Sequence, residues 1–442
     1  MGNKKFAKAE WSILIIFGLI GQIAWSVENM YFNLFVFDTV APNLSAITLM
    51  VQLSGITATV VTLIAGTLSD RLGNRRSFIS YGYIIWGVTV ALFGFLSPSL
   101  VGSLFGVGAE RAVSLTLILV IVGDCVMTLF GSTANDAAFN AWVTDNTESQ
   151  YRGKVEGVLS ILPLIAMLIV AGGFGMLVEL MGYKYLFLVL GIVITLSGVG
   201  GLFMIRDSSA LSPSGSMRDI FYGFKPSVVR ANPSLYLVLL IVLIYGVACQ
   251  IFMPYLIIYM STYLGFSVVE YSAVFAVAIL LGAAVNLYLT RLSDKQDKTN
   301  MLYYAALVFA FGLFAMYLAR GVGKTATLLL FGISGLVMIT GYIFISALAN
   351  SLVRDHTPSG EVGKLQGVRM VFSVLIPMIV GPLVGNLINS ARNIPLPDAA
   401  SPDSMTTEYI PAPEIFLAAA ITTLLLLILI PVLKKSLKKN ER

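Results

Sequence analysis

Residues 140–158 have the sequence NAWVTDNTESQYRGKVEGV, and residues 350–368 have the sequence NSLVRDHTPSGEVGKLQGV. When the two stretches are aligned without a gap, at a constant offset of 210, nine of the nineteen positions carry the same residue. A shorter repeat, LSDR at residues 68–71 and LSDK at residues 292–295, accompanies them. Internal similarity of this kind indicates a chain built from two homologous halves, as in transporters with parallel repeats.

The composition indicates what these halves are made of. The chain has 442 residues, of which 57% are hydrophobic and only 12% are charged, about half the charged fraction of a typical soluble domain. The composition excludes a soluble enzyme, a disordered protein and a nucleic-acid-binding protein, in spite of the net charge of +5. Its mean hydropathy is +0.87, which is typical of a membrane protein with many spans.

A transmembrane helix needs about 20 apolar residues, and the sequence contains twelve suitable runs. We predict an all-α membrane protein in which twelve transmembrane helices form two six-helix repeats. The predicted spans are residues 11–37, 46–68, 77–97, 116–143, 155–178, 185–205, 234–260, 268–290, 301–319, 326–350, 363–390 and 414–433.

The long polar stretch between the sixth and seventh spans divides the chain. We predict an N-terminal half over residues 1–205, a linker over residues 206–233 and a C-terminal half over residues 234–442. Within the linker, residues 219–229 form an amphipathic segment with three aromatic side chains, which predicts a position on the membrane surface.

The distribution of Lys and Arg predicts the orientation. Cytoplasmic loops are enriched in these residues. With both termini cytoplasmic, only five of the 28 lie in outside loops: Arg111, Lys184, Arg320, Lys324 and Arg392. We therefore expect a multi-pass protein of the plasma membrane with both termini inside, and we expect it to act as a monomer.

The residue inventory predicts no cofactor and no metal site. The only histidine is His356, and the two cysteines, Cys125 and Cys249, lie inside apolar runs. A phosphate-binding glycine-rich loop ending in Lys-Ser or Lys-Thr is absent, which excludes an ATP-driven pump for this chain. We expect a secondary transporter whose partners are a small-molecule substrate, a coupling ion and the lipid bilayer.

The loop GTLSDRLGNRR at residues 66–76 resembles the signature of the major facilitator superfamily. The resemblance covers the whole chain and implies alternating access with a cytoplasmic gate of acids and bases at the helix ends. In this sequence the implied gate residues are Asp70, Arg71, Arg75, Asp145 and Arg152, with Asp294 and Asp355 as their second-half counterparts.

Two shorter segments resemble sugar transporters of that superfamily. QIAWSVE at residues 22–28 is similar to the first span of the sucrose:proton symporters. DAAFNAWVTD at residues 136–145 is similar to the fourth span of the glycoside–pentoside–hexuronide:cation symporters, where the aspartate binds sugar. Gln22, Ala58 and Thr62 stand where sodium-using members carry acids, which leaves the proton as the expected coupling ion.

Polar residues in the first span form the predicted substrate surface. Gln22, Asn29 and Asn33 follow helical spacing on one face, and Trp25 flanks them. Sugar sites combine amide hydrogen bonds with an aromatic surface, although the same residues could instead hydrogen-bond neighbouring helices. The predicted substrate-binding residues are Gln22, Trp25, Asn29, Asn33, Asp136, Gln250 and Tyr255.

Two acids at membrane depth are the candidates for proton coupling, Glu28 and Asp124. An ionisable group there costs at least about 2.5 kcal/mol, so it requires a function or a partner. The alternatives are a structural hydrogen bond for Glu28 and a water-filled outer vestibule for Asp124.

Two transport functions remain open. The first is proton-coupled symport of a sugar, either a glycoside or a disaccharide. The second is proton-coupled efflux of drugs or other small molecules by an antiporter. Antiporters of the superfamily carry a Gly-Pro signature in span five, whereas here the Gly-Pro pair at residues 381–382 lies in span eleven. A non-transporting sensor with the same fold is a third, weaker hypothesis.

Overall fold

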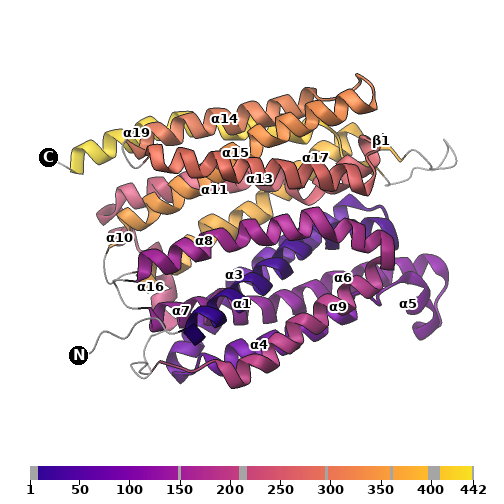
Figure 1. The fold of residues 1–442 in the computed structure, drawn as a ribbon, viewed down its shortest axis with the longest axis horizontal. Helices are drawn as coiled ribbons and strands as arrows, with labels where there is room; N and C mark the ends of the chain where they lie inside the picture. Colours follow the sequence, from indigo (N-terminus) through magenta and orange to yellow (C-terminus); the bar gives the residue numbers. More distant parts are fainter. Residues whose placement is uncertain are drawn as a thin grey trace. The chain divides into compact units, whose positions relative to one another are not determined.

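The computed structural model describes residues 8–147, 151–208, 217–293, 297–358, 362–396 and 409–440. These residues are almost entirely helical (Figure 1). The first-half α-helices are α1 (Lys8–Val27), α2 (Asn33–Phe35), α3 (Leu44–Leu72), α4 (Arg76–Phe93), α5 (Pro98–Phe105), α6 (Ala109–Gly131), α7 (Asn140–Asn146), α8 (Arg152–Ile169) and α9 (Gly175–Met204).

The remaining α-helices are α10 (Pro226–Ala231), α11 (Pro233–Phe252), α12 (Leu256–Ile258), α13 (Val268–Ser293), α14 (Lys298–Leu318), α15 (Lys324–His356), α16 (Val362–Met370), α17 (Ile376–Arg392), α18 (Glu414–Leu424) and α19 (Leu426–Asn440). Wider π-helical turns join several of them: η1 (Glu28–Phe32), η2 (Val36–Val40), η3 (Ser132–Phe139), η4 (Val170–Phe174), η7 (Tyr259–Tyr263) and η8 (Val371–Leu375). The 3₁₀ helices are η5 (Met217–Phe224) and η6 (Met253–Tyr255), and β1 (Ile394–Pro395) pairs antiparallel with β2 (Tyr409–Ile410).

The described residues contain eleven helical stretches long and apolar enough to cross a membrane. One of them, Gly157–Met204, is too long for a single span and is interrupted at Gly182, whose φ of 76° is unfavourable for other residues. This break divides it into two spans, which gives twelve crossings. The predicted twelve-span all-α fold is therefore confirmed.

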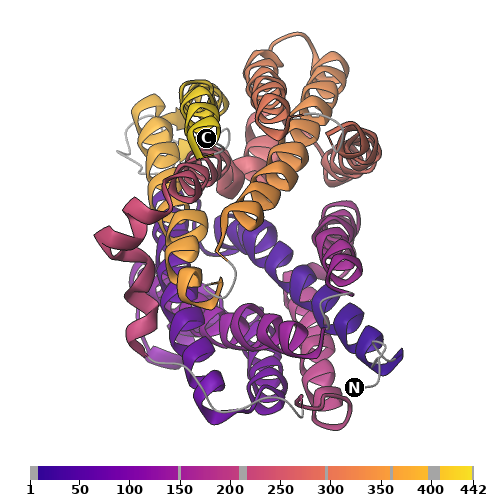
Figure 2. The same ribbon diagram turned by 90° about the vertical axis from the view of Figure 1, so that its left-hand side faces the viewer.

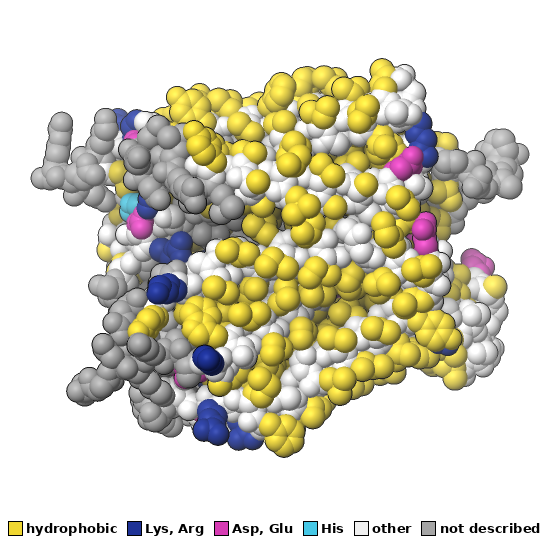
Figure 3. All heavy atoms as spheres, in the orientation of Figure 1, with side chains coloured by type: hydrophobic (Ala, Val, Ile, Leu, Met, Phe, Trp, Pro, Cys, Tyr) yellow, Lys and Arg dark blue, Asp and Glu magenta, His cyan; other side chains and the backbone are white. Residues whose placement is uncertain are grey.

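Hydrophobic side chains cover the helices between their ends (Figure 3). Many large ones are exposed, among them Leu180 at 81%, Phe203 at 80% and Ile428 at 67%. Such exposure is unfavourable in water but appropriate in hydrocarbon. Lys and Arg side chains gather near helix ends in the same view.

The chain forms two compact units. One contains the described parts of residues 1–41 and 56–219, and the other those of residues 42–55 and 220–442. The division falls inside the continuous helix α3, so the first three turns of this helix belong to the second unit. The other unit boundary, between residues 219 and 220, lies within the predicted linker.

In the first unit, α4 and α9 lie side by side (Figures 1 and 2) because glycines let their backbones meet. A Cβ atom on Gly87 would lie 2.4 Å from the Gly191 carbonyl oxygen, and one on Gly191 would meet the Gly87 carbonyl equally closely. In the second unit, Gly312 and Gly341 allow the same approach of α14 and α15. Small residues at helix contacts are typical of membrane proteins.

The internal repeat has the same local structure in both halves. α7 ends at Asn146 and α15 ends at His356, exactly 210 positions later. The hydroxyl groups of Thr147 and Thr357 each donate to a valine carbonyl one turn earlier, both at 2.6 Å. The predicted two-repeat architecture is thus visible at the level of helix ends.

The sequence analysis missed two small elements. Helix α5 begins after Ser97, whose hydroxyl accepts from the Leu100 amide at 3.3 Å, with Pro98 in its first turn. It ends at Phe105 and is followed by Gly106, whose φ of 63° terminates the helix. The β1–β2 pair was also unexpected, because each strand is only two residues long.

The amphipathic part of the linker forms η5 and α10. Phe221 is 69% exposed and Phe224 is 43% exposed, whereas Gly223 packs against Val368 of α16 and its carbonyl accepts from the Tyr236 hydroxyl. One side of this segment is therefore fixed to the second unit, and the aromatic side chains remain outside. The predicted location at the membrane surface stays a prediction.

Candidate substrate and coupling site

Asp136 is the centre of a polar cluster in the first unit. It lies in η3, the π-helical part of the fourth span. The Ser132 hydroxyl donates to Oδ2 at 3.1 Å, and the Asn135 amide reaches Oδ1 at 3.4 Å. The buried indole N–H of Trp25 makes no hydrogen bond of ordinary length, and the Asp136 carboxylate lies beside it. Two predicted substrate residues, Trp25 and Asp136, are therefore brought together.

Aromatic rings from two spans support this cluster. The ring centroids of Trp25 and Trp86 are 5.1 Å apart, and those of Trp86 and Tyr83 are 5.5 Å apart. The Tyr83 hydroxyl lies 3.0 Å from the Asn135 amide oxygen and 2.7 Å from the Phe17 carbonyl oxygen. Asn135 and Tyr83 are not among the site residues predicted from the sequence. Only the position of Asn135 beside Asp136 could have indicated its role.

Two glycines make this close packing possible. A Cβ atom on Gly131 would lie 2.8 Å from the Trp86 ring and 3.1 Å from the Trp25 ring. A Cβ atom on Gly21 would lie 2.4 Å from the Asn135 amide oxygen. Larger residues at either position would force the aromatic or amide side chains apart.

The two predicted coupling acids lie on neighbouring helices. Glu28, at the start of η1, is 8% exposed and accepts from the Thr128 hydroxyl at 3.1 Å. Asp124, 2% exposed, precedes Thr128 by one turn on the same side of α6. The structure thus places both acids at one contact between the first and fourth spans.

The acids and the polar cluster occupy successive levels of the same two spans. On the first span, Trp25 precedes Glu28, whereas on the fourth span Asp136 follows Thr128. This order is the one expected for antiparallel helices, and both levels carry π-helical turns, η1 and η3. π-Helical turns occur frequently at functional sites.

The predicted polar stripe of the first span is only partly realised. Gln22 is half-buried and Asn29 is exposed, whereas Asn33 is 2% exposed. The amide of Asn29 donates to the Trp25 carbonyl at 2.7 Å, and that of Asn33 donates to the Asn29 carbonyl at 3.1 Å. Asn33 is therefore buried, one turn beyond the exposed Asn29.

The second-unit candidates have different surroundings. Gln250 is half-buried, and α17 approaches it closely at Gly381. Tyr255 is fully buried, and its hydroxyl lies 2.6 Å from the Thr48 hydroxyl and donates to the Pro382 carbonyl at 2.9 Å. In this conformation Tyr255 joins residues 42–55 of α3 to α17. That environment is typical of a packing residue.

Arg75 connects the predicted gate residues of the first half. Its side chain, 5% exposed, forms an ion pair with Asp70 and a second with Asp145, the latter at 3.0 Å from Nε to Oδ2. Nη1 also donates to the Ser69 hydroxyl at 2.5 Å. Arg71 is exposed at the end of α3, and the side chain of Arg152 lies outside the described part of the chain.

Asp207, which was not predicted as a site residue, contacts the same loop from the segment that follows α9. Its Oδ1 accepts from the backbone amides of Arg75 and Arg76, both at 2.9 Å. A carboxylate at a helix N-terminus satisfies free amides and compensates the helix dipole. Asp207 had been assigned to the linker, where no local pattern indicated a partner in the second-to-third loop.

The second-half counterpart is less buried. Asp355 pairs with Lys298 at 2.6 Å, and Lys298 also donates to the Ser351 hydroxyl at 2.9 Å. The side chains of Asp355 and Lys298 are 47% and 38% exposed. Asp294, the other predicted member, lies outside the described residues. Lys298 was not predicted.

This difference in burial predicts unequal effects in the two halves. Replacing Lys298 by Met should lower the free energy of unfolding by at most about 1 kcal/mol, because exposed ion pairs contribute little. Thermal unfolding of the detergent-solubilised protein measures this change. An effect as large as that of removing Arg75 would contradict the inference.

The described residues contain no group of three or more His, Cys, Asp and Glu side chains that could hold a metal ion. The polar cluster instead offers hydrogen-bond donors, a carboxylate and aromatic faces, which suit a polar organic molecule.

Comparison with known proteins supports the assignment of the fold. A family model described as the Major Facilitator Superfamily matches residues 14–382. No curated protein is similar enough in sequence to count as a significant match.

Several solved structures are similar in fold. A D-xylose-proton symporter has a TM-score of 0.70 and 12% identity, with 95% of this chain and 96% of that chain covered. A mutant of the nucleoside transporter NupG has a TM-score of 0.68 and 12% identity, with 96% and 99% covered. A bacterial homologue of the human lysosomal transporter Spinster, inward-facing and unoccupied, has a TM-score of 0.68 and 12% identity, with 99% of both chains covered.

Proposed function

This chain belongs to the major facilitator superfamily, and we propose that it is a symporter that couples the entry of a sugar to that of a proton. It is a multi-pass membrane transporter of small molecules, not an enzyme. The proposal rests on one observation: buried acids and a polar aromatic cluster occupy successive levels of the same two spans.

The cluster around Asp136 supports a sugar as the substrate. A sugar presents hydroxyl groups around an apolar ring face. The carboxylate of Asp136 can accept hydrogen bonds from hydroxyl groups, and the Trp25 ring can cover the ring face. The Trp25 indole N–H, which lies beside the Asp136 carboxylate, can donate to a sugar oxygen. We assign a glycoside or disaccharide as the substrate class.

The Glu28 and Asp124 carboxyl groups support a proton as the coupling ion. Both are buried, and a charged side chain at membrane depth is costly, which suits groups that bind a proton during transport. A proton bound to Glu28 or Asp124 would lie next to the level of the Asp136 cluster, in the same two spans. Binding of sugar and proton could therefore influence each other through the first and fourth spans.

Transport in proteoliposomes tests the proposal. The protein is reconstituted, a pH gradient is imposed, and uptake of labelled glycosides and disaccharides is compared with that of nucleosides and a cationic drug. Uphill accumulation of a sugar that stops on addition of a protonophore is the expected result. Transport of none of the sugars, with accumulation of another class, would contradict the substrate assignment.

Sodium should not stimulate transport. The first-span and second-span positions that carry acids in sodium-using relatives are Gln22, Ala58 and Thr62 in this chain. Sodium sites require clustered oxygen ligands, usually with carboxylate. The measurement is initial uptake at constant pH with sodium replaced by choline. A saturable increase with sodium would overturn the choice of ion.

Proton-coupled efflux is the second candidate, because a Gly-Pro pair occurs in α17. The structure gives this pair a packing environment: Gly381 contacts Gln250, and the Pro382 carbonyl accepts from Tyr255. Symport therefore remains the preferred proposal. Substrate movement against, and not with, an imposed proton gradient would favour the antiporter.

A further inference from the structure

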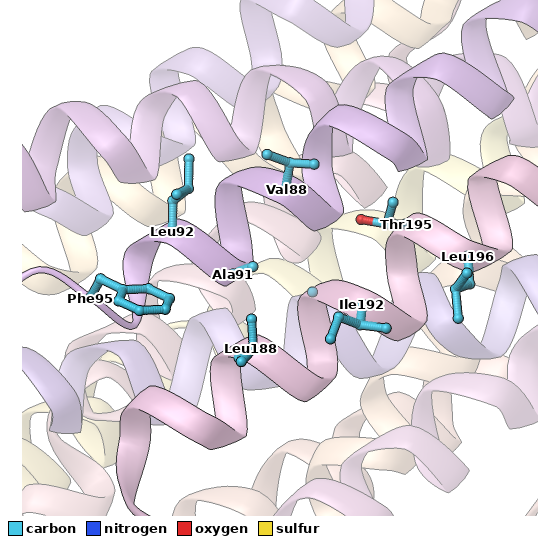
Figure 4. Close-up of a pocket in the computed structure, with 9 residues that line it drawn as sticks. Val88, Ala91, Leu92, Phe95, Leu188, Ile192, Thr195 and Leu196 are labelled. Atoms are coloured by element: carbon cyan, nitrogen blue, oxygen red, sulfur yellow. The ribbon is translucent and has the colours of Figure 1, made fainter.

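An apolar groove lies on the outside of the first unit, between α4 and α9 (Figure 4). It has a volume of about 310 Å³. Its walls are two rows of side chains, from Val88, Ala91, Leu92 and Phe95 on one side and Leu188, Ile192, Thr195 and Leu196 on the other, with Gly191 between them. None of these residues belongs to the candidate transport site.

The groove faces outward and is apolar along its length. Leu92 is 61% exposed, Leu196 is 63% exposed and Ile192 is 47% exposed. The single polar side chain, Thr195, directs its hydroxyl to the Ile84 carbonyl at 3.4 Å. The contact of Gly87 with Gly191 brings the two backbones together, and the absence of side chains there leaves a recess. This surface offers van der Waals contact but no hydrogen bond.

Its length matches one leaflet of a bilayer. Leu188 and Leu196 are eight residues apart on α9, which corresponds to about 12 Å along the helix. The hydrocarbon core of a bilayer is about 30 Å thick, so one leaflet occupies about 15 Å. A single acyl chain lying along the groove would therefore fill it through most of that depth.

A cation is held at one end of the groove. The Lys184 ammonium lies 4.7 Å from the centroid of the Phe95 ring and 5.9 Å from that of Tyr185. Lys184 comes one turn before Leu188 and directly after the helix break at Gly182, where the span ends. Its backbone is fixed by Gly94, where a Cβ atom would lie 3.1 Å from the Lys184 carbonyl oxygen. The exposed ammonium therefore lies where the span ends, the level at which a lipid headgroup is expected.

We propose that the α4–α9 groove and Lys184 form a binding site for an anionic phospholipid. One acyl chain lies between the two rows of side chains, and the headgroup phosphate pairs with the Lys184 ammonium. The occupant is a bilayer lipid because the groove is apolar, opens to the exterior of membrane-spanning helices and ends at a cation. The proposal is independent of the substrate that the protein transports.

The test uses phosphatidylglycerol with a photoreactive diazirine on one acyl chain. The full-length protein is reconstituted in nanodiscs, irradiated and digested, and the labelled peptides are identified by mass spectrometry. We expect labelling concentrated on residues 88–95 and 188–196. Uniform labelling of all lipid-facing helices would show annular lipid only and would overturn the proposal.

Two variants with matched controls separate the parts of the site. Ile192→Trp fills the groove and should reduce photolabelling of the groove residues at least about tenfold. Each acyl methylene group that is no longer buried costs about 0.8 kcal/mol, so the loss of two lowers the affinity by about that factor. Ile118→Trp, at a 57% exposed position of α6, should leave the labelling unchanged.

Lys184→Gln should weaken the preference for phosphatidylglycerol over phosphatidylcholine about fivefold, whereas Arg111→Gln should not. Equal effects of a variant and its control would contradict the assignment.

A stability measurement provides an independent readout. Adding phosphatidylglycerol to the detergent-solubilised protein should raise its unfolding temperature, because a ligand that binds only the folded state stabilises it. The rise should be lost in Ile192→Trp and kept in Ile118→Trp. An equal rise in both variants would contradict a specific site.

Discussion

Glu28→Gln should abolish uphill accumulation of substrate while leaving downhill exchange largely intact. Each pH unit of an imposed gradient corresponds to 1.36 kcal/mol, enough for about tenfold accumulation with one coupled proton. Gln cannot bind that proton but can still contact the Thr128 hydroxyl, so the helix contact at 3.1 Å should survive. We expect the accumulation ratio to fall from about ten to about one. Uptake and counterflow in proteoliposomes measure the two properties.

A second acid of the same span provides the control. Asp38 accepts from the Tyr183 hydroxyl at 2.7 Å and is exposed, so Asp38→Asn should leave coupling intact. Thr128→Val keeps the Glu28 carboxyl but removes the hydrogen bond from the Thr128 hydroxyl, and should shift the pH dependence of uptake without abolishing accumulation. Normal uphill accumulation by Glu28→Gln would exclude this residue from coupling and leave Asp124 as the candidate.

Arg75→Gln should reduce the transport rate by one to two orders of magnitude and also destabilise the protein. The guanidinium contacts Asp70, Asp145 and Ser69 and is almost fully buried. A hydrogen bond to a charged group contributes about 1.5–3 kcal/mol, and removing one partner of a buried pair leaves a charge uncompensated. The Asp70 side chain is 41% exposed, so water can solvate its charge when Arg75 is removed. We therefore expect the free energy of unfolding to fall by about 3 kcal/mol, the lower end of the range for a broken buried ion pair. Thermal unfolding and initial uptake rates measure the two effects.

Arg76→Gln is the matched control, since Arg76 is adjacent but exposed, and its side chain donates to the Leu202 carbonyl and not to a buried carboxylate. It should change stability by less than about 1 kcal/mol. Combining Arg75→Gln with Asp145→Asn should recover part of the loss, because the uncompensated charge is removed. Equal behaviour of the two arginine variants, or no recovery in the double variant, would contradict a central role for Arg75.

Contacts between side chains that are far apart in the sequence were the hardest to predict. The sequence motifs group Asp70 and Asp145 with three arginines, and in the structure both acids pair with Arg75. Asp207 and Lys298 were not predicted, because a contact between segments that are distant in the sequence leaves no local pattern. Tyr255 was selected as a substrate residue for its polar aromatic character, but its hydroxyl is used by Thr48 and Pro382.

The sequence alone determined the twelve spans, the two repeats and the position of the charged loop. Span length and charge placement are local properties set by the thickness and dielectric of the bilayer. The repeat follows from direct comparison of the residues in the two halves, and in the structure α7 and α15 end at the same offset of 210 residues.

Only the tertiary structure decided which face of each helix is buried and which partner each polar group finds. In water, the hydrophobic side of a helix indicates its buried face. In a bilayer the lipid is as apolar as the protein core, so hydrophobic periodicity does not distinguish the two faces. Small residues such as Gly87, Gly131 and Gly191 and interhelical hydrogen bonds then set the helix contacts, and these require the positions of all the helices together.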